Sequence, residues 1–246
     1  MTKNKIGYTK EPITTIDNIP VFSENDSFVE NYKNIAIDHI TAMNSGELNP
    51  FIEADLWARL EQSTQNLVSK YVSDGSRILD AGVGMGRVLA PLDQLDRYGV
   101  DISMEYLHIA REAGFNVAFS RIEDMPYQDN YFDAVIATDV LEHVVDLHAC
   151  CKQIVRVIKP GGTLIIRVPY DDDMNAYLAD DLPYEFIHLR SFDLAELRIL
   201  FSKIFNLEYI DHEYVAPYLK GQHRMKINLL PLNDRVREIA QQVNRE

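Results

Sequence analysis

The sequence of 246 residues contains only two cysteines, Cys150 and Cys151, and these are adjacent. Adjacent cysteines are awkwardly placed for an ordinary structural disulfide, because the bridge requires a specific separation and orientation of the two side chains. We expect both to be reduced packing residues on a helix. No Cys/His spacing of the zinc type accompanies them, so we expect no metal site.

Long hydrophobic runs are missing as well. The first twelve residues are polar and lack the apolar centre of a secretory signal. No later window contains the ~20 apolar residues that a membrane-spanning helix needs. These absences predict a soluble, cytoplasmic protein that does not associate with membranes.

Positive charge is scarce. Lys and Arg total 24 residues against 38 for Asp and Glu, so the formal net charge is -14. Such a surface repels a phosphate backbone, whereas proteins that bind nucleic acid normally carry a basic patch. We therefore expect a small-molecule partner and no nucleic acid, with the protein acting as a monomer or a homodimer.

The period of the hydrophobic pattern changes along the chain. Residues 1–72 predict helices, interrupted at Asn49-Pro50. Over residues 73–246, short apolar runs alternate with helical stretches, which is typical of a parallel sheet covered on both faces. The expected strands are 77–81, 98–102, 116–120, 132–138 and 163–168, with helices at 86–94, 104–113, 145–158 and 193–204. The runs 206–211 and 223–230 alternate like half-exposed strands and predict an antiparallel hairpin.

A glycine-rich turn follows the first predicted strand. The segment Asp80-Ala81-Gly82-Val83-Gly84-Met85-Gly86 connects a buried strand to a helix, where the chain turns sharply and a ligand can touch the backbone. Asp101 ends the next strand, about 20 residues later, where a carboxylate can accept hydrogen bonds from two ribose hydroxyls. Together these features predict a nucleoside-binding site.

Five segments, taken in order, resemble the successive motifs of class I S-adenosylmethionine (SAM)-dependent methyltransferases. Among these enzymes, the motifs are most similar in type to those of the small-molecule methyltransferases of ubiquinone and menaquinone biosynthesis. The segments are 80–86, 98–103, 123–133, 139–143 and 159–162. The resemblance extends over about residues 77–211 and depends on order and spacing. It implies an α/β, Rossmann-like, mostly parallel seven-stranded sheet with an antiparallel C-terminal hairpin, helices on both faces and an N-terminal helical cap, residues 1–72, over the cofactor site.

The same resemblance assigns the glycine-rich turn and its neighbour to SAM. It implies that Gly82, Gly84 and Gly86 let the backbone approach the methionine and ribose parts of the cofactor. Asp80 would lie close to the amino-acid end, and Asp101 would bind the ribose hydroxyls.

Further along the chain, the resemblance assigns residues to the adenine and to the reacting end. Ser103 and Met104 would flank the adenine, with Met104 as a soft apolar face, and the amide of Ile122 would meet a ring nitrogen. Thr138 and Asp139 would face the amino-acid moiety and the sulfonium.

Arg121 departs from the family pattern. It occupies the position where the family usually has an acidic residue for the adenine amino group, and arginine carries no hydrogen-bond acceptor. The adenine amine must then be bound by a backbone carbonyl, by Glu123 or by Asp124.

Residues 169–192 are the expected acceptor loop, because they leave the carboxyl edge of the sheet, where such folds bind ligands. Tyr170 and Tyr184 could stack on an acceptor or line a cation. Arg190 belongs to a stretch that resembles one near the acceptor in related enzymes. The alternative is that the acidic run in this segment is a solvated loop and its aromatic residues are packing.

Methyl transfer to a hydroxyl or an ammonium also requires that a proton be removed. His188 is the first candidate for the base, because imidazole has a suitable intrinsic pKa and this residue follows the tyrosine-rich loop. His143 is the competitor, since it follows the fourth predicted core strand. A purely structural role is the alternative for each.

The sequence therefore predicts an enzyme that transfers methyl from SAM to oxygen or nitrogen of a small soluble metabolite, with oxygen favoured. The alternatives are a carbon acceptor, as in the similar quinone enzymes, and a protein that binds SAM without turnover. A nicotinamide-dependent dehydrogenase is the remaining rival, but Arg87 stands where its fingerprint needs a third glycine.

Overall fold

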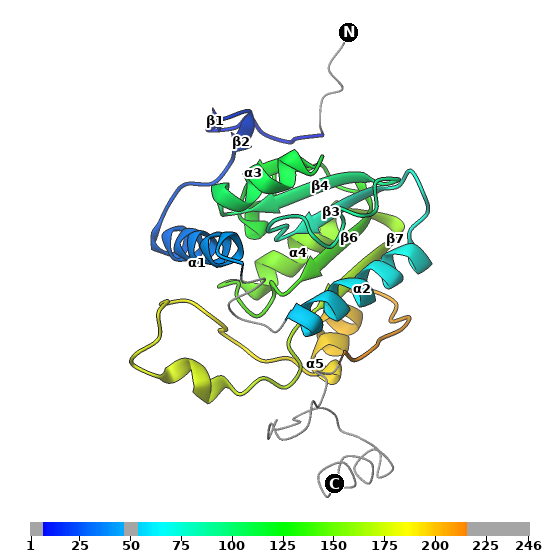
Figure 1. Cartoon of the computed structure of the whole chain (residues 1–246). Helices are drawn as coiled ribbons and strands as arrows, with labels where there is room; N and C mark the ends of the chain where they lie inside the picture. Colours follow the sequence, from blue (N-terminus) through cyan, green and yellow to red (C-terminus); the bar gives the residue numbers. More distant parts are fainter. Residues whose placement is uncertain (1–6, 47–53, 216–246) are drawn as a thin grey trace, which may run out of the picture.

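The computed structural model describes residues 7–46 and 54–215 of the chain. Within them a seven-stranded sheet has the order β1-β2-β5-β4-β3-β6-β7 and is flanked by helices (Figure 1). Every neighbouring pair of strands is parallel except β1 and β2. The strands are β1 (Thr14–Ile16), β2 (Ile19–Val21), β3 (Arg77–Ala81), β4 (Asp96–Asp101), β5 (Asn116–Phe119), β6 (Phe132–Thr138) and β7 (Ile158–Arg167). The mostly parallel, seven-stranded, Rossmann-like sheet is thereby confirmed.

The antiparallel pair lies at the N-terminal side of the sheet and not, as predicted, near the C-terminus. Asp17 and Asn18 join β1 to β2 with φ values of 48° and 64°, which is the backbone conformation of a tight type I′ hairpin turn. These strands escape sequence analysis because each has only three residues and β1 is exposed throughout, so no alternating pattern develops.

The predicted strand at residues 206–211 is absent. Asn206 takes a left-handed φ of 56°, and the amide of Leu207 bonds back to the carbonyl of Phe201 at 2.9 Å. The Leu207 side chain packs on the core, whereas Ile210 is exposed. Leu207 therefore makes a single packing contact and is not part of a strand. The second predicted run, 223–230, lies outside the described residues.

Five α-helices surround the sheet in the described part of the chain. They are α1 (Ser27–Asn44), α2 (Ala54–Tyr71), α3 (Met104–Glu112), α4 (Leu147–Val157) and α5 (Leu194–Arg198), the last continuing as a π-helix over Ile199–Ile204. The helix predicted at 86–94 is replaced by a series of turns. Pro91 explains the difference, because it has no N–H to donate to the preceding helical turn. Among the described residues, no helix is both long and apolar enough to cross a membrane.

Two clusters of buried side chains cover the two faces of the sheet, as predicted. Leu79 of β3 belongs to one cluster and its neighbour Ile78 to the other, since successive side chains of a strand point to opposite faces. Cys150 and Cys151 of α4 are free and fully buried in the first cluster, which confirms them as packing residues. Leu107 of α3 packs in the second cluster, together with side chains of α1 and α2.

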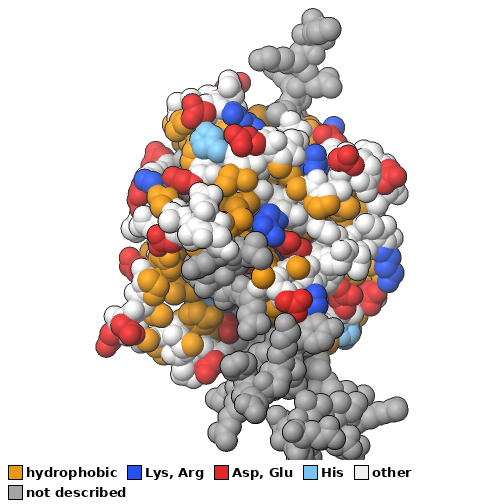
Figure 2. Space-filling view, viewed as in Figure 1, with side chains coloured by type: hydrophobic (Ala, Val, Ile, Leu, Met, Phe, Trp, Pro, Cys, Tyr) orange, Lys and Arg blue, Asp and Glu red, His pale blue; other side chains and the backbone are white. Residues whose placement is uncertain are grey.

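The carboxyl ends of the central strands open between α1, α2 and residues 169–192. In Figure 1 residues 169–192, drawn in yellow-green to yellow, form a long connection that extends away from the sheet, below α1 in this view. Figure 2, viewed from the same side, shows hydrophobic side chains gathered around a hollow in this region. The fold thus leaves one open edge of the sheet surrounded by helices and one long connection.

Candidate active site

A cavity of about 1390 Å³ lies at this edge of the sheet. Its wall includes the glycine-rich turn after β3, the ends of β4 and β6, the inner faces of α1 and α2, and parts of residues 169–192. It continues along β7 to residues 206–215. This volume exceeds the ~300 to 1,000 Å³ of ordinary ligand pockets, so it can hold two molecules side by side.

The glycine-rich turn faces the cavity through two of its three glycines. Gly82 has a φ of +85°, and a Cβ there would come within 2.2 Å of the Val140 side chain. Gly84 has a φ of +50°, and nothing lies within 4 Å of the Cβ position. Gly86 does not line the cavity, because its missing side chain makes room for the ring of Phe115 at 2.9 Å. The open space at Gly84 is where a ligand can meet backbone.

Asp101, at the end of β4, is held by the backbone of this same region. One carboxylate oxygen accepts a hydrogen bond from the N–H of Gly84 at 2.8 Å, and the other accepts one from the N–H of Ser103 at 2.9 Å. Burial raises the pKa of Asp101, and these backbone donors oppose the shift. A carboxylate has about four lone-pair sites, so both oxygens can still accept a hydroxyl each.

Beyond Asp101 the predicted adenine residues separate into two groups. Ser103 and Ile122 are buried and line the cavity. The hydroxyl of Ser103 caps α3 by accepting the N–H of Tyr106 at 3.3 Å. Met104 is not part of the cavity wall in the described structure and packs against the core instead.

The departure at Arg121 has a structural explanation. Its guanidinium donates to both carboxylate oxygens of Asp26, at 2.6 and 2.5 Å, and lies over the ring of Phe28 at 5.1 Å. Asp26 is the N-cap of α1. Arg121 therefore ties the start of α1 to the end of β5, a contact that an acidic residue could not make.

The opposite end of the turn carries a buried acid. Asp80 is 1% exposed, and its Oδ1 has no hydrogen-bond partner among the described residues. Burial raises its pKa well above the ordinary value, with Arg167 opposing the shift. A buried carboxyl oxygen without a partner is costly unless a ligand satisfies it.

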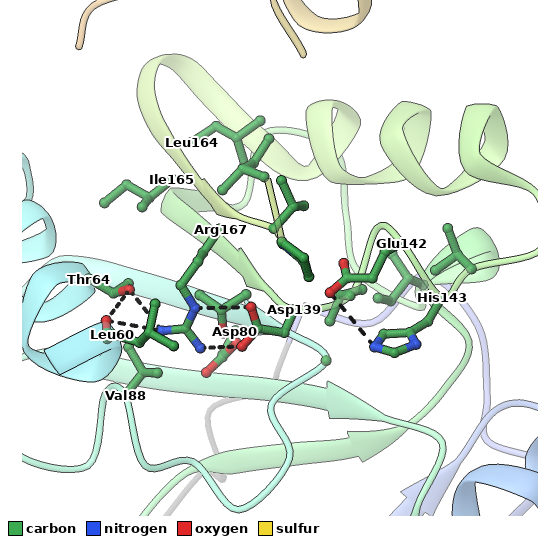
Figure 3. Close-up of a pocket in the computed structure, with 18 of the residues that line it drawn as sticks. Leu60, Thr64, Asp80, Val88, Asp139, Glu142, His143, Leu164, Ile165 and Arg167 are labelled. Atoms are coloured by element: carbon green, nitrogen blue, oxygen red, sulfur yellow. Dashed lines mark hydrogen bonds and ion pairs between the residues drawn. The ribbon is translucent and has the colours of Figure 1, made fainter. Parts of the chain in front are cut away.

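Arg167, at the end of β7, organises this end of the cavity (Figure 3). It forms a two-bond ion pair with Asp139, at 3.1 and 2.6 Å, and it donates to the Leu60 carbonyl and the Thr64 hydroxyl of α2, each at 3.1 Å. Asp139 has a φ of 53°, which turns the chain sharply after Thr138. Thr138, Asp139 and Arg167 all line the cavity.

Arg87 follows the glycine-rich turn and contacts α2 in the same part of the cavity wall. Its guanidinium stacks over the ring of Trp57 at 4.0 Å and bonds to Glu61 at 2.7 Å. Both partners belong to α2, and all three residues line the cavity. A cation over an aromatic face contributes about 0.5 to 2 kcal/mol, so this contact stabilises α2 against the turn.

Two histidines meet on the other side of the cavity. The rings of His143 and His188 lie 4.7 Å apart. His188 Nδ1 bonds to the carboxylate of Asp172 at 2.5 Å, and the hydroxyl of Tyr177 donates to the same oxygen at 2.8 Å. His143 Nδ1 donates to the carbonyl of Ile187 at 3.0 Å. Burial and the neighbouring His188 lower the pKa of His143 to about 4.

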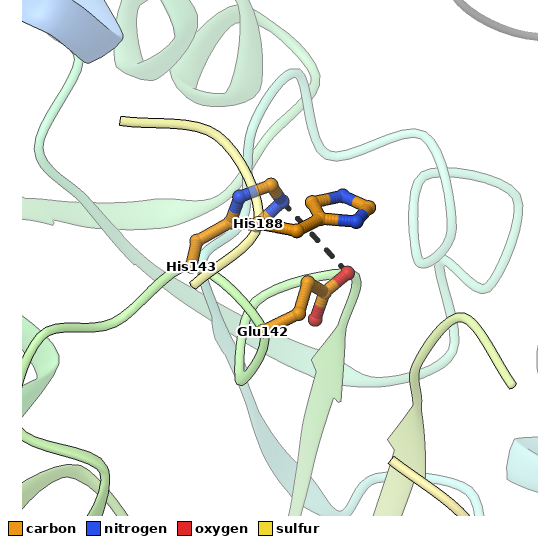
Figure 4. Close-up of side chains that lie close together, drawn as sticks. All are labelled: Glu142, His143 and His188. Atoms are coloured by element: carbon orange, nitrogen blue, oxygen red, sulfur yellow. Dashed lines mark ion pairs between the residues drawn. The ribbon is translucent and has the colours of Figure 1, made fainter. Parts of the chain in front are cut away.

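Glu142 lies beside this pair (Figure 4). It is 1% exposed, and neither carboxylate oxygen has a hydrogen-bond partner among the described residues. Its Oε1 lies 3.8 Å from His143 Nε2, beyond hydrogen-bond distance. Burial, with repulsion by Asp139, raises the pKa of Glu142 to about 8.

The three predicted acceptor residues have different surroundings. Tyr170 and Tyr184 line the cavity, and the Tyr184 hydroxyl donates to Asp38 of α1 at 2.7 Å. Arg190 is absent from the described wall. It donates to the carbonyl of Leu141 at 2.8 Å and also to that of Val144. Arg190 therefore supports the segment that carries Glu142 and His143 and does not face an acceptor.

Comparison with known proteins identifies the fold. The family model described as a methyltransferase domain matches residues 79–166. The chain is 30% identical over 154 residues to the ubiquinone biosynthesis O-methyltransferase of Xylella fastidiosa, covering 58% of this chain and 63% of that one. A SAM-dependent methyltransferase of Thermotoga maritima, described as a possible histamine N-methyltransferase, superposes with a TM-score of 0.55 at 22% identity, covering 71% and 79%. The matched domain and these similarities support a class I SAM-dependent methyltransferase.

The chain is also similar to a tRNA-modifying enzyme. The chain is 32% identical over 115 residues to the tRNA (carboxymethyluridine(34)-5-O)-methyltransferase of Arabidopsis thaliana, which covers 46% of this chain and 27% of that one. The chain spans less than two thirds of the length of these curated relatives. These matches imply SAM as the cofactor.

The cavity residues fit SAM. The unpartnered oxygen of Asp80 suits an α-ammonium, and the free lone pairs of Asp101 suit two ribose hydroxyls. The open space at Gly84 allows part of the cofactor to contact the backbone directly. When bound, SAM supplies an electrophilic methyl group on a sulfonium.

Three residues of the site have roles that the sequence patterns do not predict. They are Glu142 within the motif at 139–143, Arg167 at the end of β7, and Asp172 in the acidic run of the acceptor loop. A signal existed only for Arg167, a cation directly after the apolar run of a predicted strand, because the partners of Glu142 and Asp172 come from distant segments.

Proposed function

We propose that this protein is cytoplasmic and transfers the methyl group of SAM to an oxygen or nitrogen atom of a small soluble metabolite, with oxygen preferred. One observation carries the proposal. The turn at Gly84 and Asp101 shares a single cavity with His143, His188 and Glu142, which offer lone pairs to an acceptor. The ubiquinone O-methyltransferase relative supports an oxygen acceptor.

The cap is part of the proposal. We assign residues 1–72 to a segment that covers the cofactor and residues 73–246 to the SAM-binding core, with the acceptor loop at 169–192. Tyr32 of α1 and Trp57 of α2 line the cavity. The side chain of Asn31 joins α1 to the acceptor loop by accepting from the N–H of Glu185 and donating to the carbonyl of Phe186. Covering the reactants in this way excludes water from the reacting atoms.

Methyl transfer depends first on placing the acceptor atom in line with the methyl carbon and sulfur, because the departing thioether is neutral and needs no acid. Asp80 and Asp101 fix the two ends of the cofactor, and Asp139 with Arg167 closes the wall beside its reacting end. The acceptor then approaches from the side of the two histidines.

His188 is the proposed proton acceptor for a hydroxyl. Asp172 accepts the Nδ1 proton of His188 at 2.5 Å, which fixes the tautomer and leaves Nε2 with a lone pair. A carboxylate partner also stabilises the imidazolium that forms, whereas the carbonyl partner of His143 carries no charge. This contrast favours His188 over His143.

A tRNA acceptor is the second candidate, favoured by the relative from Arabidopsis thaliana. The formal net charge of -14 argues against it, because a phosphate backbone requires compensating cations.

The two acceptor classes separate in one assay. Purified protein with SAM is offered phenols, sugars, amines and bulk tRNA, and S-adenosylhomocysteine is measured. We expect turnover with a small hydroxyl or amine compound. Turnover with tRNA alone would replace the proposal by the second candidate, methylation at carbon would revise the acceptor atom, and SAM binding without any turnover would contradict catalysis.

A further inference from the structure

Three side chains that can bind a metal ion come together in the acceptor half of the cavity. One ligand atom each from Glu142, His143 and His188 lies within 4.8 Å of the other two. Glu142 and His143 follow β6, while His188 arrives from the long segment after β7, as Figure 4 shows. We infer that Glu142, His143 and His188 bind one divalent transition-metal ion.

Both imidazoles have a hydrogen-bond acceptor at Nδ1, as metal-bound histidines often have at their other nitrogen. The carbonyl of Ile187 and the carboxylate of Asp172 can only accept, so Nδ1 of His143 and of His188 must carry a proton. Nε2 of each neutral ring then carries a lone pair, and that of His143 lies 3.8 Å from Glu142 Oε1. Histidines that ligate metals nearly always donate their other N–H to a carboxylate or a backbone carbonyl, and both types of partner are present here.

Glu142 supplies the charge that such an ion requires. Its carboxylate is almost completely buried, and neither oxygen has a hydrogen-bond partner among the described residues. Arg167, the cation that acts electrostatically on Glu142, is already paired with Asp139. A buried carboxylate without a partner is unfavourable, and coordination of a cation removes that cost.

The spacing is close to what coordination demands. Ligand atoms that bind one tetrahedral ion at ~2.0 to 2.1 Å lie ~3.3 Å apart. Glu142 Oε1 and His143 Nε2 are 3.8 Å apart, and the widest separation in the cluster is within 4.8 Å. Side-chain rotations that bring the atoms closer by up to ~1.5 Å complete the set. Three protein ligands leave a position open to the cavity, as in catalytic metal sites.

The ligand types select the metal. Imidazole suits Zn²⁺, Co²⁺, Fe²⁺ and Ni²⁺, whereas Mg²⁺ and Ca²⁺ prefer sets made of oxygen alone. Two nitrogens and one carboxylate therefore favour a first-row transition metal over Mg²⁺.

The consequence for catalysis rests on the proposed methyl transfer, whereas ion binding does not. An ion held at this site would lower the pKa of an acceptor hydroxyl at its open position, and the proton would leave to solvent before the cap excludes water. The acceptor oxygen then forms the bond to the methyl carbon, and the electron pair of the broken C–S bond stays on sulfur. With the ion in place, His188 holds the metal. In the ion-free protein, His188 accepts the proton itself.

Binding is measured without any acceptor. The full chain is stripped with a chelator and titrated with Co²⁺, followed by its visible absorption, and with Zn²⁺ and Mg²⁺ by calorimetry. We expect one Co²⁺ or Zn²⁺ per chain, weak Mg²⁺ binding, and loss of the site in Glu142→Gln and His188→Ala. Asp172→Asn keeps all three ligands and should weaken binding ~10- to 100-fold.

The matched control is His108→Ala. His108 belongs to α3, faces Asp17 and does not line the described cavity. SAM affinity, measured for every variant, shows whether the fold survives. Absence of Co²⁺ and Zn²⁺ binding in the wild type would overturn the inference, as would equal binding in His188→Ala and His108→Ala. Ion binding with no methylation of any acceptor would instead contradict the proposed function and leave the metal site standing.

Discussion

The carboxylate of Asp101 accepts a hydrogen bond from the backbone N–H of Gly84 at 2.8 Å. The end of β4 and the glycine-rich turn after β3 therefore hold each other in place. No heavy atom lies within 4 Å of the Cβ position of Gly84. The hydrogen bond to Asp101 therefore anchors the turn while its cavity side stays open to a ligand. This pairing makes both residues testable.

Asp101→Ala should weaken SAM binding while the protein stays folded. The variant removes charge-assisted bonds to the ribose worth ~1 to 3 kcal/mol, which is a loss of roughly tenfold to a hundredfold in affinity. Calorimetric titration with SAM and with NAD measures the change. Unchanged SAM affinity would move the ribose elsewhere and undermine the assignment of the turn.

Gly84→Ala should reduce SAM affinity more than it reduces stability. The new methyl group enters open cavity space, and the positive φ costs about 1 to 2 kcal/mol. Gly75→Ala is the matched control, because Gly75 also has a positive φ and nothing within 4 Å but does not line the described cavity. Equal loss of SAM affinity in both variants would show that backbone strain, and not occupancy of the cavity, is responsible.

Asp80→Asn should stabilise the cofactor-free protein at neutral pH and weaken SAM binding. Burial raises the pKa of Asp80 above its ordinary value of 3.8. The folded state therefore binds the proton more tightly than the unfolded state, so stability declines as the pH rises above about 3.8 and through the raised pKa. The amide variant lacks this decline.

Thermal unfolding of both proteins between pH 4 and pH 8 measures the effect at Asp80. The difference in melting temperature should grow with pH and shrink when saturating SAM is added, because the cofactor satisfies the carboxylate. A difference that does not depend on pH would contradict ionisation as the cause.

His188→Ala should lower turnover at least ~10²-fold with little change in SAM affinity, since a positioned base contributes ~10² to 10⁴-fold. His108→Ala is the control for loss of an imidazole outside the cavity. Survival of turnover in His188→Ala together with its collapse in His143→Ala would make His143 the base. Full activity of both would indicate an amine that is already neutral when bound, and catalysis by positioning alone.

The central fold was predictable because its signals are local. The strand β3 matches the predicted residues 77–81, and the turn at residues 80–86 and the acid at Asp101 are separated by one strand and its connection. Periodicity and glycine spacing act over a few residues, so they report strands, helices and the turns between them. The parallel core of the sheet and the cofactor-binding edge follow from these patterns.

Tertiary structure alone decided which distant residues meet. His188 reaches His143 and Glu142 across more than forty positions of sequence, and Arg121 finds Asp26 at the start of α1. The antiparallel pair likewise lies at β1 and β2, where strands of three residues show no period. Such contacts depend on how helices and long connections pack on the sheet, because burial and hydrogen bonding between remote segments leave no repeating pattern in the sequence.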